Sequence, residues 1–210
     1  MTTYFEIFSL PPHLTIDTAA LEKSFYALSR KLHPDRFASR PAAEQEAALA
    51  ESSRLNDAYR TLKDPIARTE YLLKLEGVEM EEQSKSATEL ARTTGTAKKQ
   101  VVPEDLLEEA FELNMQLEEM RAAKKMGSAS GSSEPDDPQL RADLQRAKSE
   151  FDAKLAATDA DLATLHTQWD TAVDSNNATA KLAARDAMVA LLNRRSYLRN
   201  LVRDVNDALE

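Results

Sequence analysis

Apolar residues recur three or four positions apart along almost the whole 210-residue chain, and this spacing constrains the fold more than any other feature. Only four glycines and eight prolines are present, so there are few points at which a helix must end. Between those points, stretches rich in Ala, Leu, Glu, Lys and Arg favour helix. The sequence therefore predicts an all-α fold, with a helical hairpin near the N-terminus and an antiparallel bundle of three helices after it.

Two polar stretches divide the helical pattern. Residues 77–102 are only weakly periodic, and we interpret them as a linker that contains a short helix at 84–91. Residues 127–138 are rich in Gly, Ser, Asp and Pro, which is typical of a flexible connector. The predicted organisation is an N-terminal domain of residues 1–76, the linker, and a C-terminal three-helix domain of residues 103–210.

The first long helical pattern stops at the tripeptide His33-Pro34-Asp35. Proline lacks an amide hydrogen, and its ring disfavours helical geometry at the residue before it. A second helical pattern begins a few residues later, after Pro41. We therefore expect His33 and Asp35 in an exposed loop at the tip of the N-terminal hairpin.

Charge is unevenly distributed along the chain. The net charge is −9, yet residues 1–75 carry ten Lys/Arg and ten Asp/Glu, so the excess of acid lies in residues 76–210. Such an acidic second part argues against nucleic-acid binding. Residues 21–40 are locally basic because they include Lys23, Arg30 and Lys31. This positive patch faces either a partner or only solvent.

A helix predicted from Pro103 to about Met126 carries two apolar stripes. At about 100° per residue, one stripe comprises Leu106, Ala110, Leu113, Leu117 and Met120. The second stripe comprises Leu107, Phe111 and Met115, and it is flanked by Glu108 and Glu112. Two interpretations stay open for the second stripe: burial in the bundle, or a partner-binding patch with an acidic rim.

Few residues indicate catalysis or metal binding. The chain has no cysteine and no glycine-rich phosphate loop, and His33 and Asp35 have no third ligand at useful spacing. His13 and His166 are expected to be exposed to solvent rather than to act as ligands. We therefore expect a non-enzymatic protein with no cofactor and no metal; an enzyme or metal protein built on His33 and Asp35 is the alternative.

Nothing in the sequence indicates a membrane or an exported protein. No apolar run approaches the ~18 residues that a membrane-spanning helix needs. The first residues contain no basic leader, so we expect neither a signal peptide nor a transit peptide. The expected location is the cytoplasm.

Several segments together resemble a J-domain. They are the opening residues 4–10, the basic helix before His33-Pro34-Asp35, residues 56–62 after it, and the closing residues 64–73. The continuation of the tripeptide through residues 36–39 and the Arg-Thr-Glu-Tyr-Leu-Leu ending are similar to one branch, the HscB co-chaperones of iron–sulfur cluster assembly. The segment 106–120, the pair Trp169-Asp170 and the last helix extend the resemblance over most of the chain.

The resemblance implies a protein with two binding surfaces. The first would engage a DnaK-class ATPase chaperone, HscA in this family, and stimulate its ATP hydrolysis; it comprises His33, Pro34, Asp35, Lys23, Arg30 and Lys31. The second would hold the cluster scaffold protein IscU; it comprises Leu107, Glu108, Phe111, Glu112, Met115 and Leu191. A general J-domain co-chaperone of DnaK with other clients is the alternative.

The chain departs from the family pattern in three respects. The paired CxxC motifs that precede the J-domain in animal relatives are absent. Met115 stands where an acidic residue is usual, and the helix before His33 carries fewer basic residues than many J-domains. These departures bear on the strength of partner binding more than on the identity of the partners.

Overall fold

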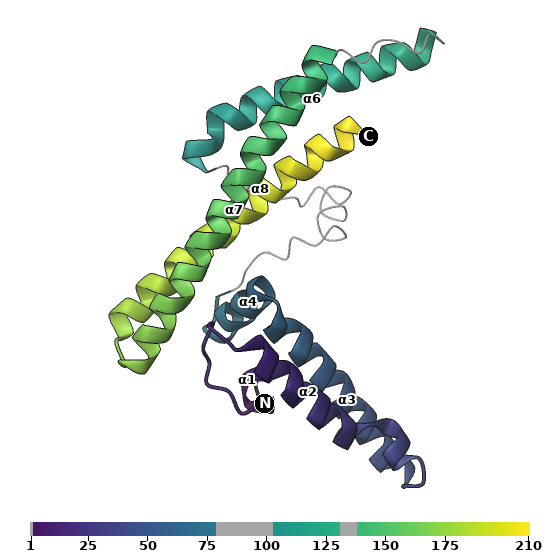
Figure 1. Ribbon diagram of the computed structural model, residues 1–210, viewed down its shortest axis with the longest axis vertical. Helices are drawn as coiled ribbons and strands as arrows, with labels where there is room; N and C mark the ends of the chain where they lie inside the picture. The colour runs from purple at the N-terminus through teal and green to yellow at the C-terminus, as the bar shows by residue number, and fades with distance from the viewer. Residues whose placement is uncertain (1, 79–102, 131–137) are drawn as a thin grey trace. The chain divides into compact units, whose positions relative to one another are not determined.

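The computed structural model of the chain describes residues 2–78, 103–130 and 138–210, and every regular element in them is helical (Figure 1). The predicted all-α fold is thus confirmed. The helices and the 3₁₀ turns η1 and η2 are α1 (Tyr4–Ile7), α2 (Thr18–Leu32), η1 (Pro34–Phe37), α3 (Ala42–Lys63), α4 (Pro65–Leu75), η2 (Glu104–Leu106), α6 (Leu107–Ser130), α7 (Pro138–Asp174) and α8 (Ala178–Leu209).

The N-terminal hairpin is formed by α2 and α3, which lie side by side (Figure 1). Asp17 is the N-cap of α2, and its carboxylate accepts hydrogen bonds from the backbone N–H groups of Ala19 and Ala20. Leu21 of α2 and Leu55 of α3 are each only 2% exposed, so the predicted apolar stripes meet in a shared core. Pro41 is the N-cap of α3 and lies directly before its first helical residue, Ala42.

Polar caps define the ends of α4. The Asp64 carboxylate accepts from Ala67 N–H at the start of the helix. At its other end, Gly77 has a φ of +78°, and the N–H groups of Gly77 and Val78 donate to the carbonyls of Lys74 and Leu73. This paired pattern is the Schellman motif, which requires the left-handed conformation that glycine adopts without steric cost.

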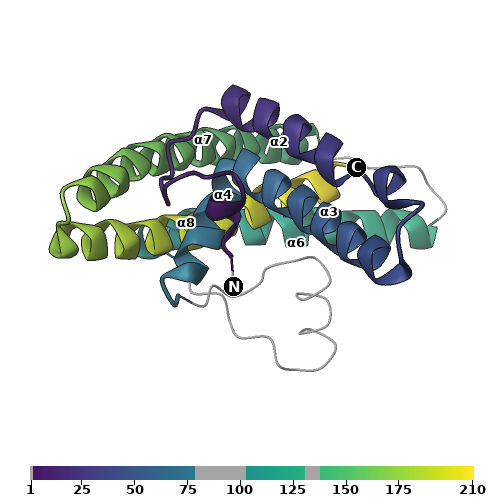
Figure 2. The ribbon, with the colours of Figure 1, turned by 90° about the horizontal axis from the view of Figure 1, so that it is seen from below.

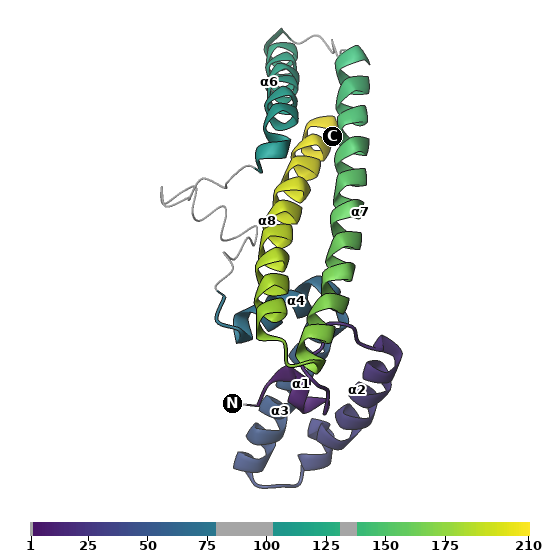
Figure 3. The same ribbon diagram turned by 90° about the vertical axis from the view of Figure 1, so that its left-hand side faces the viewer.

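The three C-terminal helices share a second hydrophobic core. The predicted inner stripe begins in η2 and continues along α6. It is buried, and each of its residues is at most 3% exposed: Leu106, Ala110, Leu113, Leu117 and Met120. Leu144 and Phe151 of α7 and Leu198 and Val205 of α8 complete the centre of this core. Figures 1 and 3 show α7 and α8 running alongside each other, as the predicted antiparallel bundle requires.

The turn between α7 and α8 is also set by local chemistry. Asn176 has a φ of 52°, and the N–H groups of Asn176 and Asn177 donate to the carbonyls of Val173 and Ala172. The Asn177 side chain then accepts from Ala180 N–H and so caps the start of α8. Asparagine tolerates the left-handed conformation better than most residues, and the helical hairpin closes in a short turn (Figure 2).

The chain divides into two compact units that do not follow the linear order of the sequence. One unit comprises Met1–Glu81 and Thr164–Met188, and the other comprises Glu82–Ala163 and Val189–Glu210. The distal end of the α7–α8 hairpin, residues 164–188, therefore belongs to the unit of the N-terminal helices. The predicted boundaries 1–76 and 103–210 stay a prediction.

The predicted polar segments are only partly visible. Helix α6 continues to Ser130, past the predicted helix end near Met126 and into the segment expected to be a flexible connector. Residues 131–137 lie outside the described part of the chain. The same holds for residues 79–102 of the predicted linker, including the short helix expected at 84–91.

Candidate chaperone-binding and scaffold-binding surfaces

The His33-Pro34-Asp35 tripeptide forms the start of η1 at the tip of the hairpin. His33 ends α2 with extended backbone (φ −61°, ψ 128°), and Pro34 then begins the 3₁₀ turn. His33 Nδ1 accepts from Asp35 N–H at 3.3 Å and lies 3.5 Å from Asp35 Oδ2. The side chains of His33 and Asp35 are 55% and 88% exposed. The turn therefore fixes the backbone while it leaves both functional groups accessible.

The loop after the tripeptide is tied to both helices of the hairpin. Arg36 Nη1 donates to the carbonyl of Arg30 in the last turn of α2, at 3.4 Å. Gln45 Nε2 of α3 donates to the carbonyls of Ala38 and Arg40, at 3.2 and 2.8 Å. These contacts limit the motion of the tip, so less conformational entropy is lost when it docks.

The basic residues before the tip are free to act on a partner. Lys23, Arg30 and Lys31 of α2 are all exposed. None of their side chains forms an ion pair with the residues that the structure describes. Unpaired surface cations contribute little to the stability of the fold, but they attract an acidic surface over a distance.

The outer stripe of α6 is uncovered in the described structure. Leu107, Phe111 and Met115 are 52%, 68% and 61% exposed, and the flanking Glu108 and Glu112 are exposed as well. Three large apolar side chains on successive turns of one helix form a contiguous patch, unlike the isolated apolar residues common on protein surfaces. Of the two interpretations of the second stripe, burial in the bundle is thus excluded for the described residues.

Two ion pairs hold η2 and the beginning of α6 against α8 and α7. Arg194 of α8 donates to the Asp105 carboxylate, and this hydrogen bond lowers the pKa of Asp105 from its usual value. Lys154 of α7 pairs with Glu109. The ion pairs therefore restrain the start of the helix that carries the outer stripe. Leu191 on α8, the last residue of the predicted scaffold surface, is half-buried.

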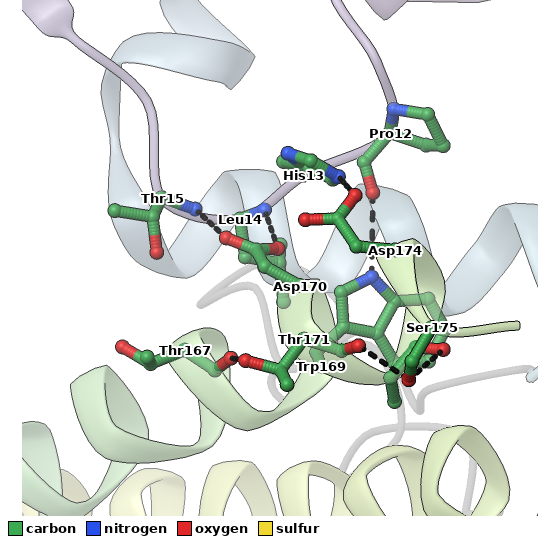
Figure 4. Close-up of polar contacts among 11 residues, drawn as sticks. Pro12, His13, Leu14, Thr15, Thr167, Trp169, Asp170, Thr171, Asp174 and Ser175 are labelled. Atoms are coloured by element: carbon green, nitrogen blue, oxygen red, sulfur yellow. Dashed lines mark hydrogen bonds and ion pairs between the residues drawn. The ribbon is translucent and has the colours of Figure 1, made fainter. Parts of the chain in front are cut away.

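A cluster of polar contacts that the sequence did not predict joins the N-terminal loop to the end of α7 (Figure 4). Asp170 Oδ1 accepts from Leu14 N–H at 2.7 Å, and Asp170 Oδ2 accepts from Thr15 N–H at 2.8 Å. Trp169 Nε1 donates to the Pro12 carbonyl at 3.3 Å, and its side chain is 1% exposed. We call these contacts the loop–hairpin junction. It holds the chain just before α2.

Two further contacts complete the loop–hairpin junction. His13 Nε2 lies 3.0 Å from Asp174 Oδ1 (Figure 4). The His13 side chain is 24% exposed, so it is partly buried and not solvent-exposed as expected. Lys181 Nζ lies 2.8 Å from Glu76 Oε1 and 5.1 Å from the centre of the Trp169 ring. The junction therefore engages both the loop before α2 and the end of α4.

His166 is a correction to the sequence-based expectation, because it is buried (6% exposed) rather than solvent-exposed. Its Nε2 lies 2.7 Å from Thr69 Oγ1, and Thr69 Oγ1 donates its only proton to the Pro65 carbonyl. Thr69 must therefore accept from His166, which places the imidazole proton on Nε2. Burial, together with the nearby Arg68 guanidinium, lowers the pKa of His166 to about 4. A signal was present, since His166 follows Leu162 by four residues and so lies on the apolar stripe.

The described residues were compared with the requirements of a metal site and of a membrane-spanning helix. Within residues 2–78, 103–130 and 138–210, no three His, Cys, Asp or Glu side chains converge as a metal site would require. In the same ranges, no helix has the length and apolar character to cross a lipid bilayer.

Comparison with known proteins supports the resemblance. The model of the DnaJ domain family matches residues 3–71. A chaperone HscB from Vibrio cholerae has 30% sequence identity and a TM-score of 0.57, with 99% of each chain covered. The chain belongs to the HscB family. A co-chaperone HscB homolog from Neisseria meningitidis is 51% identical over 79 residues, which are 38% of this chain. The matched segment spans only about half of that relative, 48% of its length.

More distant co-chaperone structures share the fold. Human co-chaperone HscB has a TM-score of 0.59 at 22% identity, with 97% of this chain and 80% of that chain covered. Jac1 from Saccharomyces cerevisiae has a TM-score of 0.51 at 21% identity, with 99% and 96% covered. Together, the DnaJ-domain match and the HscB relatives show that the protein is a J-domain co-chaperone of the HscB type.

Proposed function

We propose that this HscB protein is a non-enzymatic, cytoplasmic co-chaperone of iron–sulfur cluster assembly. It binds the scaffold protein IscU, delivers it to the DnaK-class chaperone HscA and stimulates the ATPase activity of that chaperone. The scaffold-binding domain comprises residues 103–210. The observation that carries the proposal is the uncovered stripe of Leu107, Phe111 and Met115 on a helix whose opposite stripe is buried.

The chaperone-binding surface is the exposed tip together with the basic face of α2. Asp35 is 88% exposed and is available to a basic residue of the chaperone, while Lys23, Arg30 and Lys31 steer an acidic surface towards it. Contact with the tip shifts the conformational equilibrium of the chaperone towards the state that hydrolyses ATP. In this role His33 and Asp35 bind a partner and perform no chemistry on a substrate.

The scaffold-binding surface is the outer stripe of α6 with its acidic rim, and Leu191 of α8 extends it. Phe111 is the most exposed of the three large side chains and lies at the centre of the stripe, where interface residues contribute most to affinity. Glu108 and Glu112 flank it and complement basic residues at the edge of the scaffold interface.

The test measures binding to IscU and stimulation of HscA separately. Phe111→Ala is expected to weaken IscU binding by at least about 30-fold, the loss of a central hot-spot side chain. Stimulation of the HscA ATPase in the absence of IscU should stay at the wild-type level. Leu182→Ala is the matched control, because Leu182 is similarly exposed (50%) on α8 and has no assigned role.

Two results would contradict the proposal. If the wild-type chain does not bind IscU but does stimulate a DnaK-class chaperone, the protein is a general J-domain co-chaperone with other clients. If Phe111→Ala and Leu182→Ala bind IscU equally well, the outer stripe of α6 is not the scaffold-binding surface.

A further inference from the structure

Tyr26 is a large aromatic side chain that neither the core nor the proposed surfaces use. It lies on α2 and is 56% exposed. Lys23 precedes it by three residues and Arg30 follows it by four, so the three side chains share one face of the helix. A single exposed apolar residue needs no explanation by itself. An aromatic ring between two unpaired cations of a binding face does need one.

The Tyr26 ring is supported on one side. It packs at a tilt on Phe25, with 5.5 Å between ring centres, and Phe25 stacks on Tyr59 of α3 at 4.2 Å. The Tyr59 hydroxyl donates to Glu22, and Lys63 lies 5.3 Å from the centre of the Tyr59 ring. Phe25 and Tyr59 are half-buried, so the three rings form a row across the surface of α2 and α3, and Tyr26 is its exposed end.

The Tyr26 hydroxyl forms no hydrogen bond within the described part of the chain. Tyrosine loses little conformational entropy on binding because it has few rotatable bonds, and support from Phe25 reduces that loss further. A supported ring with a free hydroxyl offers both apolar contact area and a polar group to a partner.

The flanking cations identify what covers the ring. A second copy of this face would oppose Lys23, Arg30 and Lys31 with the same three positive charges, which disfavours self-association. An acidic protein surface is complementary to it. Because surface cations are strongly hydrated and screened by salt, they supply steering more than affinity. Short-range affinity therefore needs a side chain that is desolvated in the complex.

We propose that Tyr26 is the aromatic anchor of the chaperone-binding face, and that it contacts an apolar site within an acidic surface of the DnaK-class chaperone. This inference rests on the proposed function and adds to it a residue that supplies affinity. Lys23, Arg30 and Lys31 set the rate and salt dependence of the encounter. Tyr26 sets how long the complex lasts.

The experiment measures the concentration of the full chain that gives half-maximal stimulation of the chaperone ATPase, at low and at moderate salt. Tyr26→Ala should raise this half-maximal concentration at least about ten-fold at both salt concentrations. The ratio between the two salt conditions should stay as in the wild type, because the cations are retained. Tyr26→Phe should stay within about three-fold of wild type, because the ring is retained. Lys23→Ala should reduce the salt dependence itself. Circular dichroism checks that the helical content is unchanged.

Leu49→Ala is the control, since Leu49 is 60% exposed on α3 and lies outside the basic face. If the wild type stimulates the chaperone and Tyr26→Ala matches Leu49→Ala, Tyr26 is not an anchor and the proposed function is unaffected. If Tyr26→Phe loses as much as Tyr26→Ala, the ring does not supply the affinity, and the anchor is refuted. If the wild type stimulates no DnaK-class chaperone, both the proposed function and this inference are refuted.

Discussion

Asp170→Ala tests whether the loop–hairpin junction stabilises the loop before α2. Asp170 accepts from two backbone N–H groups, those of Leu14 and Thr15, at 2.7 and 2.8 Å. Hydrogen bonds to a charged acceptor contribute about 1.5–3 kcal/mol each. Asp170 is only half-buried, so the lower end of that range applies, and removal of the carboxylate should cost about 3 kcal/mol. If the free energy of local opening falls by about 3 kcal/mol, the open state becomes about 100-fold more populated.

Native-state hydrogen exchange measures this opening amide by amide. In Asp170→Ala, the Leu14 and Thr15 amides should exchange about 100-fold faster than in the wild type. Core amides of α6 should keep their wild-type rates, since they belong to the other compact unit. Asp170→Asn should give an intermediate rate, because its amide oxygen replaces only one of the two acceptors.

The matched control is Asp161→Ala, which removes an exposed carboxylate of the same helix. The reasoning is refuted if Leu14 and Thr15 exchange at the same rate in Asp170→Ala and Asp161→Ala. In that case packing around Trp169 would hold the loop, and the two hydrogen bonds would contribute nothing measurable.

Three further predictions follow from single side chains. His33→Gln should abolish stimulation of the chaperone ATPase without loss of helical content or of scaffold binding, because His33 is exposed; unfolding of the variant would instead show a structural role. Burial lowers the pKa of His166 in the folded chain to about 4, so the unfolded chain binds a proton at His166 at higher pH than the folded chain does. The free energy of unfolding should therefore fall by about 3 kcal/mol as pH falls from 6.5 to 4. Urea unfolding of wild type and His166→Gln checks this, since an equal loss in both would exclude His166 as the cause. Arg194→Ala should raise the pKa of Asp105 towards its usual value, as measured by NMR titration; an unchanged pKa would show that the pair is not formed in solution.

The fold could be predicted from the sequence largely because helical periodicity is a local signal. The two stripes of α6 are an example: their spacing alone separated Leu113 from Phe111, and the structure buries the first and exposes the second. The cap of α2 was also predictable, because an Asp directly before an apolar helical run is a local feature. The ends of α6 were harder to place, since helix ends depend on a few weak interactions.

The loop–hairpin junction could not be predicted in the same way. Its hydrogen bonds join residues about 155 positions apart, and no local pattern specifies such a pairing. His166 shows the consequence. His166 lies on the apolar stripe of α7, but its burial beside Thr69 depends on a second packing partner, α4, which no local pattern specifies. Burial of this kind depends on which surfaces meet.

The same long separation has a consequence for the synthesis of the protein. Chains emerge from the ribosome N-terminus first, and early domains fold before later ones exist. The helices that carry His33 and Asp35 are therefore complete long before residue 170 is translated. Until then, the Leu14 and Thr15 amides lack the Asp170 carboxylate that accepts from them in the folded chain. The newly made hairpin thus exists first with an unanchored loop before α2, and the junction closes only after helix α6 has already been synthesised.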